Sequence, residues 1–386
     1  MRLNTRPPPL PVLAFLLIRI PILLASTYEG LRGYGDFIHF YNLASLPGLP
    51  FLQYWSEFPP LFPFLNKGVF ALAGGVEHAY TYLLILFFLA ADLGSVLLAF
   101  RLEALFYPEA KPWRSVLFAA VLGGLAYAWW YFDSLALFFT LLAFYFAFSK
   151  RSAWFAGGAL GLGILTKLFP LLILPALWRT LPPRRAAVIT ACALGLTVVV
   201  YGGLWLASPA YSSASLRSQT AKGSWETAWA MLDGNYHTGN FGPEEERLDP
   251  RTASIARGNP AVVNPLLSLL VFGALGLALF FKSSVAPANA LAAASFSGLT
   301  WVIFFLWSPG WSPQWVLYML PFILLTLPER IASLLTVLFV LVNLLEWPLL
   351  LSRGLFSALP LTIFLRTMLL ILLAVTWWQD HSRSLE

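Results

Sequence analysis

Long apolar segments are the feature of this sequence that most constrains its fold. The segment 80–100, for example, contains a single charged residue, Asp92. Helices of about 20 mostly apolar residues are the elements that cross the hydrocarbon layer of a bilayer. Only 11% of the 386 residues are charged and 59% are hydrophobic, whereas a soluble domain has about 25% charged residues. These values exclude a soluble or disordered chain, and the single cysteine, Cys192, excludes a disulfide scaffold.

We therefore expect an all-α, polytopic membrane protein that forms one domain of about twelve transmembrane helices. The predicted spans are 10–27, 80–100, 115–131, 133–149, 154–166, 168–178, 186–207, 265–281, 287–307, 315–327, 331–350 and 358–378. The apolar segment 61–73 is open to interpretation as a re-entrant or interfacial piece.

The positions of the basic residues predict the orientation of these spans. With twelve spans, one side of the membrane holds Arg2, Arg6, Arg101, Lys111, Arg114, Lys150, Arg151, Arg179, Arg184, Arg185, Lys282, Arg330 and Arg383. The short loops opposite hold only Arg32, Lys67, Lys167 and Arg353. Basic residues collect in cytoplasmic loops, so both termini are predicted to be cytoplasmic. The net charge of +6 then reflects membrane orientation, and we expect no nucleic-acid partner.

Two long segments on the predicted outer side hold much of the remaining charge, namely residues 28–79 and 208–264. The second contains five basic and six acidic residues (Arg217, Lys222, Arg247, Arg251, Arg257, Glu226, Asp233, Glu244, Glu245, Glu246 and Asp249). Loops of this length in a compact protein are usually functional or disordered. The aromatic residues of the second loop can pack on the protein or the membrane interface, so we expect partial order, with residues 242–249 the most mobile part.

Two carboxylates in the first outer loop are candidates for chemistry. Asp36 follows Gly35 shortly after the first predicted span, which places it near the outer membrane surface. A carboxylate there can serve as a general base if burial or a neighbouring charge adjusts its pKa. Glu57 precedes Pro59 and Pro60, which favour an extended chain and a fixed side-chain direction. The alternative is that both are solvated loop residues, as most isolated acids are.

Several short motifs occur in a characteristic order along the chain. They are Gly35-Asp36-Phe37 with Tyr41-Asn42, Glu57-Phe58-Pro59-Pro60-Leu61, Asp92 within a span, Thr166-Lys167 with Pro170, Ser224-Trp225-Glu226-Thr227 with Asp233-Gly234, and Ser312-Pro313-Gln314-Trp315 with Leu320-Pro321. This order resembles the GT-C superfamily of polytopic membrane glycosyltransferases. Within it, the chain is most similar to the bacterial mannosyltransferases that use polyprenyl-phosphate mannose, a branch that includes the phosphatidylinositol-mannoside enzymes.

The resemblance extends over nearly the whole chain, with two departures. Phe132-Asp133 stands where a Gly-Gln-x-Asp pattern is commoner, and Trp315 replaces the usual Tyr. Both departures leave the identity of the sugar open.

The resemblance implies an inverting transfer of a sugar, with mannose favoured, from a polyprenyl-phosphate donor to an acceptor hydroxyl outside the cytoplasm. The acceptor would be a glycolipid or a glycan, the enzyme would lie in the plasma membrane of a bacterium, and no cofactor is implied. Asp36 matches the general base of the family. Because phosphate is already a good leaving group, a general acid is not obligatory, but the phosphate needs cationic hydrogen-bond donors at the outer interface.

Three basic residues are candidates for binding that phosphate. Lys167 joins two short spans on the predicted outer side, and a lysine at that depth needs an anion or water; the alternative is an interfacial lysine that extends its charge to water. Arg217 and Lys222 are secondary candidates just beyond the predicted span 186–207, with ordinary loop solvation as the alternative.

Four further polar residues complete the candidate site. His39 and His237 could contact the acceptor or a metal, but none of the four histidines has the spacing of a ligand pair, so we expect no metal site. A helix through this stretch would place Asp36 and His39 on one face. Asp133, at a hairpin tip, would contact the sugar or cap the following helix. Gln314 belongs to the late Ser-Pro-Gln motif.

Two other functions fit a chain of this kind. A transporter or a flippase for lipid-linked sugars would also have about twelve spans, but transporters place their charges at mid-membrane and are often built from repeats. Here the charges concentrate in outer loops. A ligase that uses a lipid diphosphate also carries a long outer loop, but it would leave the first-loop motifs without a role. The intramembrane Asp92 needs a partner such as Arg19 or Arg366, and we expect a structural network there.

Overall fold

The computed structural model describes residues 9–149, 151–236, 242–282 and 289–383. Most of these residues lie in helices and none in a β-strand, which confirms the all-α prediction. The α-helices are α1 (Leu10–Ala25), α2 (Tyr28–Arg32), α3 (Phe37–Ser45), α4 (Leu61–Leu72), α5 (Glu77–Phe106), α6 (Trp113–Gly124), α7 (Tyr127–Trp130), α8 (Asp133–Phe148), α9 (Ala153–Thr166), α10 (Leu174–Thr180), α11 (Pro183–Ala207), α12 (Pro209–Ala221), α13 (Ala228–Asp233), α14 (Pro265–Lys282), α15 (Ala290–Trp307), α16 (Val316–Thr326), α17 (Glu329–Leu344) and α18 (Leu359–Arg383).

Short helical turns connect or extend several of these helices. Those of 3-10 type are η1 (Phe169–Ile173), η2 (Glu244–Leu248), η3 (Thr252–Ser254), η4 (Pro313–Trp315), η6 (Leu351–Arg353) and η7 (Phe356–Ala358), whereas η5 (Leu345–Leu350) is a π-helix.

The apolar helices have the length and composition expected of a membrane protein. Among the described residues, six helical segments are both long and apolar enough to cross a bilayer, namely Glu77–Phe106, Pro183–Ala207, Pro265–Lys282, Ala290–Trp307, Glu329–Arg353 and Phe356–Gln379. Seven more apolar helices have 10–17 residues. The described part of each predicted span is largely helical, but 115–131 is divided between α6 and α7, 168–178 between η1 and α10, and 331–350 between α17 and η5. The number of spans that cross the membrane stays a prediction.

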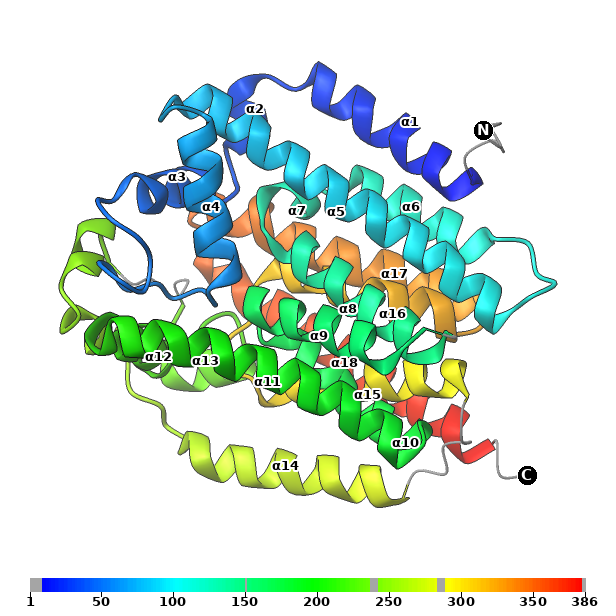
Figure 1. The fold of residues 1–386 in the computed structure, drawn as a ribbon. Helices are drawn as coiled ribbons and strands as arrows, with labels where there is room; N and C mark the ends of the chain where they lie inside the picture. The colour runs from blue at the N-terminus through cyan, green and yellow to red at the C-terminus, as the bar shows by residue number, and fades with distance from the viewer. Residues whose placement is uncertain (1–8, 150, 237–241, 283–288, 384–386) are drawn as a thin grey trace.

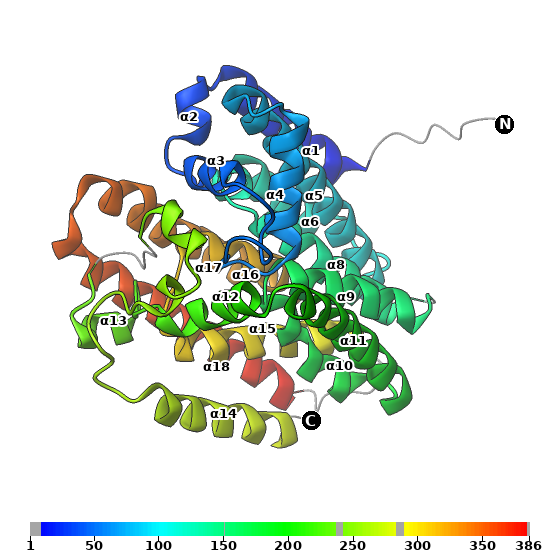
Figure 2. The same cartoon turned by 60° about the vertical axis from the view of Figure 1, so that its left-hand side comes forward.

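The two ends of the helical bundle differ in structure. Both chain termini lie at one end, together with the turn between α5 and α6 (Figure 1). The short helices α2, α3, α12 and α13 lie at the opposite end, which Figure 2 turns toward the viewer. The predicted outer segments 28–79 and 208–264 are therefore together at one end, and which end faces the cytoplasm stays a prediction.

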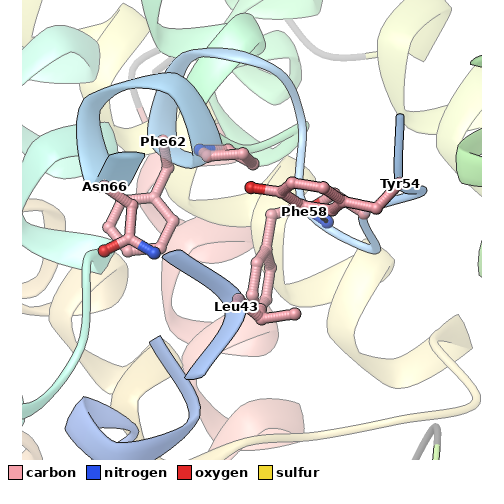
Figure 3. A pocket seen from close by; sticks show the side chains of 7 residues that line it. Leu43, Tyr54, Phe58, Phe62 and Asn66 are labelled. Carbon is pink, nitrogen blue, oxygen red and sulfur yellow. Dashed lines mark hydrogen bonds between the residues drawn. The ribbon is translucent and has the colours of Figure 1, made fainter. Parts of the chain in front are cut away.

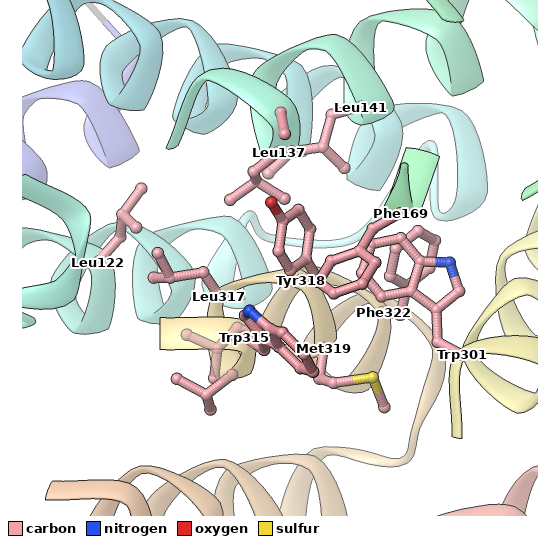
Figure 4. Close-up of a cluster of buried hydrophobic side chains, with 14 of the residues drawn as sticks. Leu122, Leu137, Leu141, Phe169, Trp301, Trp315, Leu317, Tyr318, Met319 and Phe322 are labelled. Atoms are coloured by element: carbon pink, nitrogen blue, oxygen red, sulfur yellow. The ribbon is translucent and has the colours of Figure 1, made fainter. Parts of the chain in front are cut away.

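A cluster of aromatic side chains in the bundle holds the segments that carry part of the candidate site. Phe169 of η1 packs edge-on against Trp315 and Tyr318, with ring centroids 4.7 and 5.2 Å apart (Figure 4). Trp301 of α15 lies 4.9 Å from Tyr318. Such pairs contribute about 0.5–1.5 kcal/mol each beyond their burial. The packing fixes the chain around Lys167, which directly follows α9, relative to η4.

A buried polar network joins α1, α5, α6 and α8. Arg19 pairs with Asp92 at 3.1 Å, and its Nε donates to the carbonyl of Gly123 at 2.9 Å. The other oxygen of Asp92 accepts from the Ser134 hydroxyl at 2.6 Å, and Arg19 also donates to the carbonyl of Leu122. Of the two partners that the sequence offered for Asp92, the structure selects Arg19. Because both charged groups are fully bonded, this network has the features of a structural tie.

Candidate active site

The turn that carries Asp36 is shaped by its contact with α7. The backbone N–H of Asp36 donates to the carbonyl of Trp130 at 3.3 Å. A Cβ on Gly35 would lie 2.7 Å from Cβ of Trp130, so only glycine allows the two chains to approach this closely. This contact explains the glycine of the Gly-Asp motif, because the close approach brings the aspartate against the end of the bundle. Helix α3 then begins at Phe37.

The carboxylate of Asp36 lies among four other charged side chains. It makes no capping hydrogen bond to α3, and within the described residues it forms no ion pair. Burial raises its pKa and the charge of Asp133 adds to this, whereas His39, Lys167 and Lys222 act in the opposite direction. The net effect is a pKa above the ordinary value. A buried carboxylate with a raised pKa and no ion pair is a candidate for accepting a proton from a substrate.

His39 connects the two long polar segments, 28–79 and 208–264. Its Nε2 lies 3.0 Å from Oε1 of Glu57, in the first loop, and its Nδ1 lies 2.7 Å from Oε1 of Glu244, in the second. Arg247 donates to the same Glu57 oxygen at 3.0 Å. Although burial opposes it, bonding to the two carboxylates raises the pKa of His39 to about 9, and His39 and Arg247 lower the pKa of Glu57 against the effect of burial.

This network orders a segment that the sequence suggested to be mobile. Residues 242–249 contain the 3-10 helix η2, and two of its residues, Glu244 and Arg247, form the contacts with the first loop. The side chain of Gln219, in α12, donates to the backbone carbonyl of Glu57. The two loops thus form one layer over the end of the bundle.

Lys167 is held in an aromatic surrounding by an ion pair. Its Nζ lies 2.6 Å from Oδ1 of Asp133 and 5.1 to 5.6 Å from the ring centres of Phe132, Phe169 and Trp315. Cations over aromatic faces gain electrostatic energy. The lysine is therefore not an interfacial residue that extends into water. Asp133, which the sequence predicts to contact the sugar or cap the following helix, lies in the first turn of α8 and pairs with this lysine.

Lys222 approaches the same region from the second loop. Its Nζ lies 4.6 Å from the ring centre of Trp225, and burial lowers its pKa to about 8. The indole N–H of Trp225 donates to the Ser312 hydroxyl at 3.2 Å, and its ring lies 6.1 Å from that of Trp315. A Cβ on Gly310 would lie 2.2 Å from the Trp225 ring, so a glycine is required there. Two neighbouring indoles therefore connect the surroundings of the two lysines.

The other candidates do not join this group. Arg217 is exposed on α12. Gln314 is half-buried in η4, next to Trp315. His237 lies outside the described residues. Within the described part of the chain, no three His, Cys, Asp or Glu side chains gather as metal ligands.

Two residues of the network were absent from the sequence-based candidates. Glu244 and Arg247 are three positions apart in an acidic run, and one helical turn places such residues on the same face. That spacing was the only available signal, and it gave no indication of the partners His39 and Glu57.

A small pocket lies between α3, α4 and the segment before α4 (Figure 3). It is lined by Leu43, Tyr54, Ser56, Phe58, Phe62, Pro63 and Asn66. The amide of Asn66 donates to the carbonyl of Phe40 at 2.7 Å and accepts from the hydroxyl of Tyr80. Because internal bonds use this polar group, we assign no ligand to the pocket.

No protein-family model, curated protein or solved structure matches this chain. The similarity to the GT-C superfamily therefore depends on the short motifs alone. Any function has to be argued from the charges and contacts described above.

Proposed function

We propose that this chain is an inverting membrane glycosyltransferase. It transfers a sugar, with mannose as the first candidate, from a polyprenyl phosphate to a hydroxyl of a glycolipid or glycan. The proposal includes about twelve spans in a bacterial plasma membrane, cytoplasmic termini and an active site at the outer face.

One observation carries the proposal. Asp36 is a carboxylate without an ion pair among the described residues, and the charges of Lys167 and Lys222 are close enough to influence its pKa. A base and two cations at one site are the groups that this transfer needs. The two lysines come from distant parts of the sequence. Lys167 lies against Trp315 and Lys222 against Trp225, and these two indoles contact each other.

The chemistry of the transfer assigns a role to each of these groups. The acceptor oxygen attacks the anomeric carbon from the face opposite the phosphate, and Asp36 takes the hydroxyl proton. The bond between the anomeric carbon and the phosphate oxygen breaks, and its electron pair stays on the phosphate. The phosphate gains negative charge as the bond breaks, so Lys167 and Lys222 stabilise the transition state more than the bound donor. The products are an inverted glycoside and polyprenyl phosphate.

The network of Arg19 and Asp92 favours an enzyme over the transporter and flippase alternative. A transport site near mid-membrane needs polar groups that are free to bind a substrate. Both oxygens of Asp92 accept bonds, from Arg19 and Ser134, and Arg19 also donates to two backbone carbonyls. This network has no group left for a substrate.

A donor assay with matched lysine and arginine variants tests the proposal. Purified protein in nanodiscs is given mannose, glucose, galactose or arabinose polyprenyl phosphate, together with a mannoside acceptor, and products are measured by mass spectrometry. We expect transfer from one donor and a fall of about 10- to 100-fold in its kcat/KM for Lys222→Gln, which is the loss of one charge-assisted hydrogen bond in the transition state. The control Arg217→Gln should leave kcat/KM unchanged because this side chain is exposed and is not among the charges that act on Asp36. Lipid or solute transport without any transfer would refute the proposal.

A further inference from the structure

An aromatic group formed by Tyr34, Trp130 and Trp347 lies next to the turn that carries Asp36. Tyr34 lies two residues before Asp36, and 46% of its surface is exposed. Its ring centre lies 5.7 Å from that of Trp130 and 6.2 Å from that of Trp347, which meets it edge-on. An exposed tyrosine adjoining the candidate base has no role in the transfer steps given above.

The position of Tyr34 is fixed by hydrogen bonds from two other aromatic residues. Its backbone carbonyl accepts from the indole N–H of Trp347 at 2.9 Å and from the hydroxyl of Tyr131 at 3.1 Å. Trp347 follows α17 and Tyr131 follows α7, so segments more than 200 positions apart converge on this one residue. These bonds fix the backbone at Tyr34, and the contacts with Trp130 and Trp347 hold its ring.

An unused hydrogen-bond donor adjoins the same group. Trp130 is 5% exposed, and its indole N–H has no partner within the described structure. Buried donors are nearly always bonded, and an unsatisfied one costs about 1–3 kcal/mol. The backbone carbonyl of Trp130 binds the N–H of Asp36, so this unused donor belongs to the immediate neighbour of the base.

We propose that Tyr34, Trp130 and Trp347 form the subsite for the acceptor and that the acceptor is a saccharide. The face of an aromatic ring is electron-rich and packs against the C–H groups of a pyranose, and the exposed ring of Tyr34 supplies such a face. A hydroxyl of the stacked sugar then lies beside Asp36. This part of the inference rests on the proposed transfer.

Binding of a saccharide without donor tests this subsite separately from catalysis. Methyl α-D-mannoside and an α-linked mannobiose are added to the protein in nanodiscs free of glycoside detergents, and saturation-transfer NMR reports contact with the sugar C–H groups. We expect a signal with the wild type, a loss with Tyr34→Ala and retention with Tyr34→Phe. Tyr236→Ala removes a tyrosine that is 41% exposed on the second loop and should leave the signal unchanged.

Kinetics with the same variants give a second readout. Tyr34→Ala should raise the acceptor KM roughly tenfold, the size of one good aromatic contact, and leave the donor KM unchanged. If Tyr34→Ala does not alter the NMR signal from the sugars, the proposed subsite is refuted. Transfer to an alcohol without any sugar binding would also refute it. If saccharide binding depends on Tyr34 but no lipid-phosphate donor is used, the proposed function fails and the saccharide site stands.

Discussion

Asp36 and Asp92 are two carboxylates in basic surroundings, but their bonding differs. Both oxygens of Asp92 accept hydrogen bonds, and its partner Arg19 is bonded in turn to backbone carbonyls. Asp36 lies near His39, Lys167 and Lys222 without pairing with any of them among the described residues. A fully bonded buried charge stabilises one arrangement of helices, whereas an unbonded carboxylate near cations is available to a substrate. The comparison predicts opposite effects for changes at the two sites.

The largest expected effect is the loss of turnover in Asp36→Asn. Removal of a general base lowers rates by about 10²- to 10⁴-fold. Because Asp36 has no structural partner within the described residues, thermal unfolding should stay close to that of the wild type. Single-turnover transfer and unfolding of the same preparation measure both quantities. Near-wild-type rates in this variant would show that the base is assigned wrongly.

At Asp92 we expect the opposite pattern, in which the substitution lowers stability rather than acting on turnover directly. Asp92→Ala leaves Arg19 buried without a counter-charge, and loss of one partner of a buried pair costs about 3–5 kcal/mol. We expect a fall of that size in the free energy of unfolding, which is measured by denaturant titration. The double variant Arg19→Leu with Asp92→Leu should recover most of the loss, since no charge then remains unpaired. A stable Asp92→Ala protein with impaired turnover would break the comparison.

The smallest expected effect concerns the pH dependence of the link between the outer loops. The pKa of His39 rises from 6.5 to about 9 in the folded protein, so its protonated form stabilises the fold. This contribution is complete below about pH 6.5 and is lost as the pH rises through about 9. The stability difference between wild type and His39→Gln should therefore shrink by about 1–3 kcal/mol over that range.

His78→Gln is the matched control for this pH dependence. His78 stacks on Tyr28 with ring centroids 3.8 Å apart and forms no ion pair among the described residues. Its loss should leave the pH dependence of unfolding close to that of the wild type. A stability difference for His39→Gln that does not vary with pH would show that the link between the loops does not depend on protonation of His39.

Part of the candidate site could be predicted from local sequence patterns. Asp36 and His39 were expected on one face of a helix, and α3 begins directly after Asp36. Asp133 and Lys167 were expected at the same side of the membrane, because each lies at the end of an apolar segment. Their contact at 2.6 Å was not predictable, since it depends on how α8 and α9 pack. The contact of His39 with Glu244 joins residues 205 positions apart, which no local pattern indicates.

The sequence by itself determined the helical class, the apolar segments and the two polar outer loops. These properties follow from composition and periodicity, because a bilayer accepts only apolar segments whose backbone bonds are internal. Only the tertiary structure decided which charges are bonded to one another. Pairing of side chains depends on packing geometry between distant segments, as with Arg247 and Glu57, or Trp225 on Gly310. Asp92 is paired with Arg19, whereas Asp36 is unpaired in the described structure. This difference distinguishes a structural carboxylate from the candidate base.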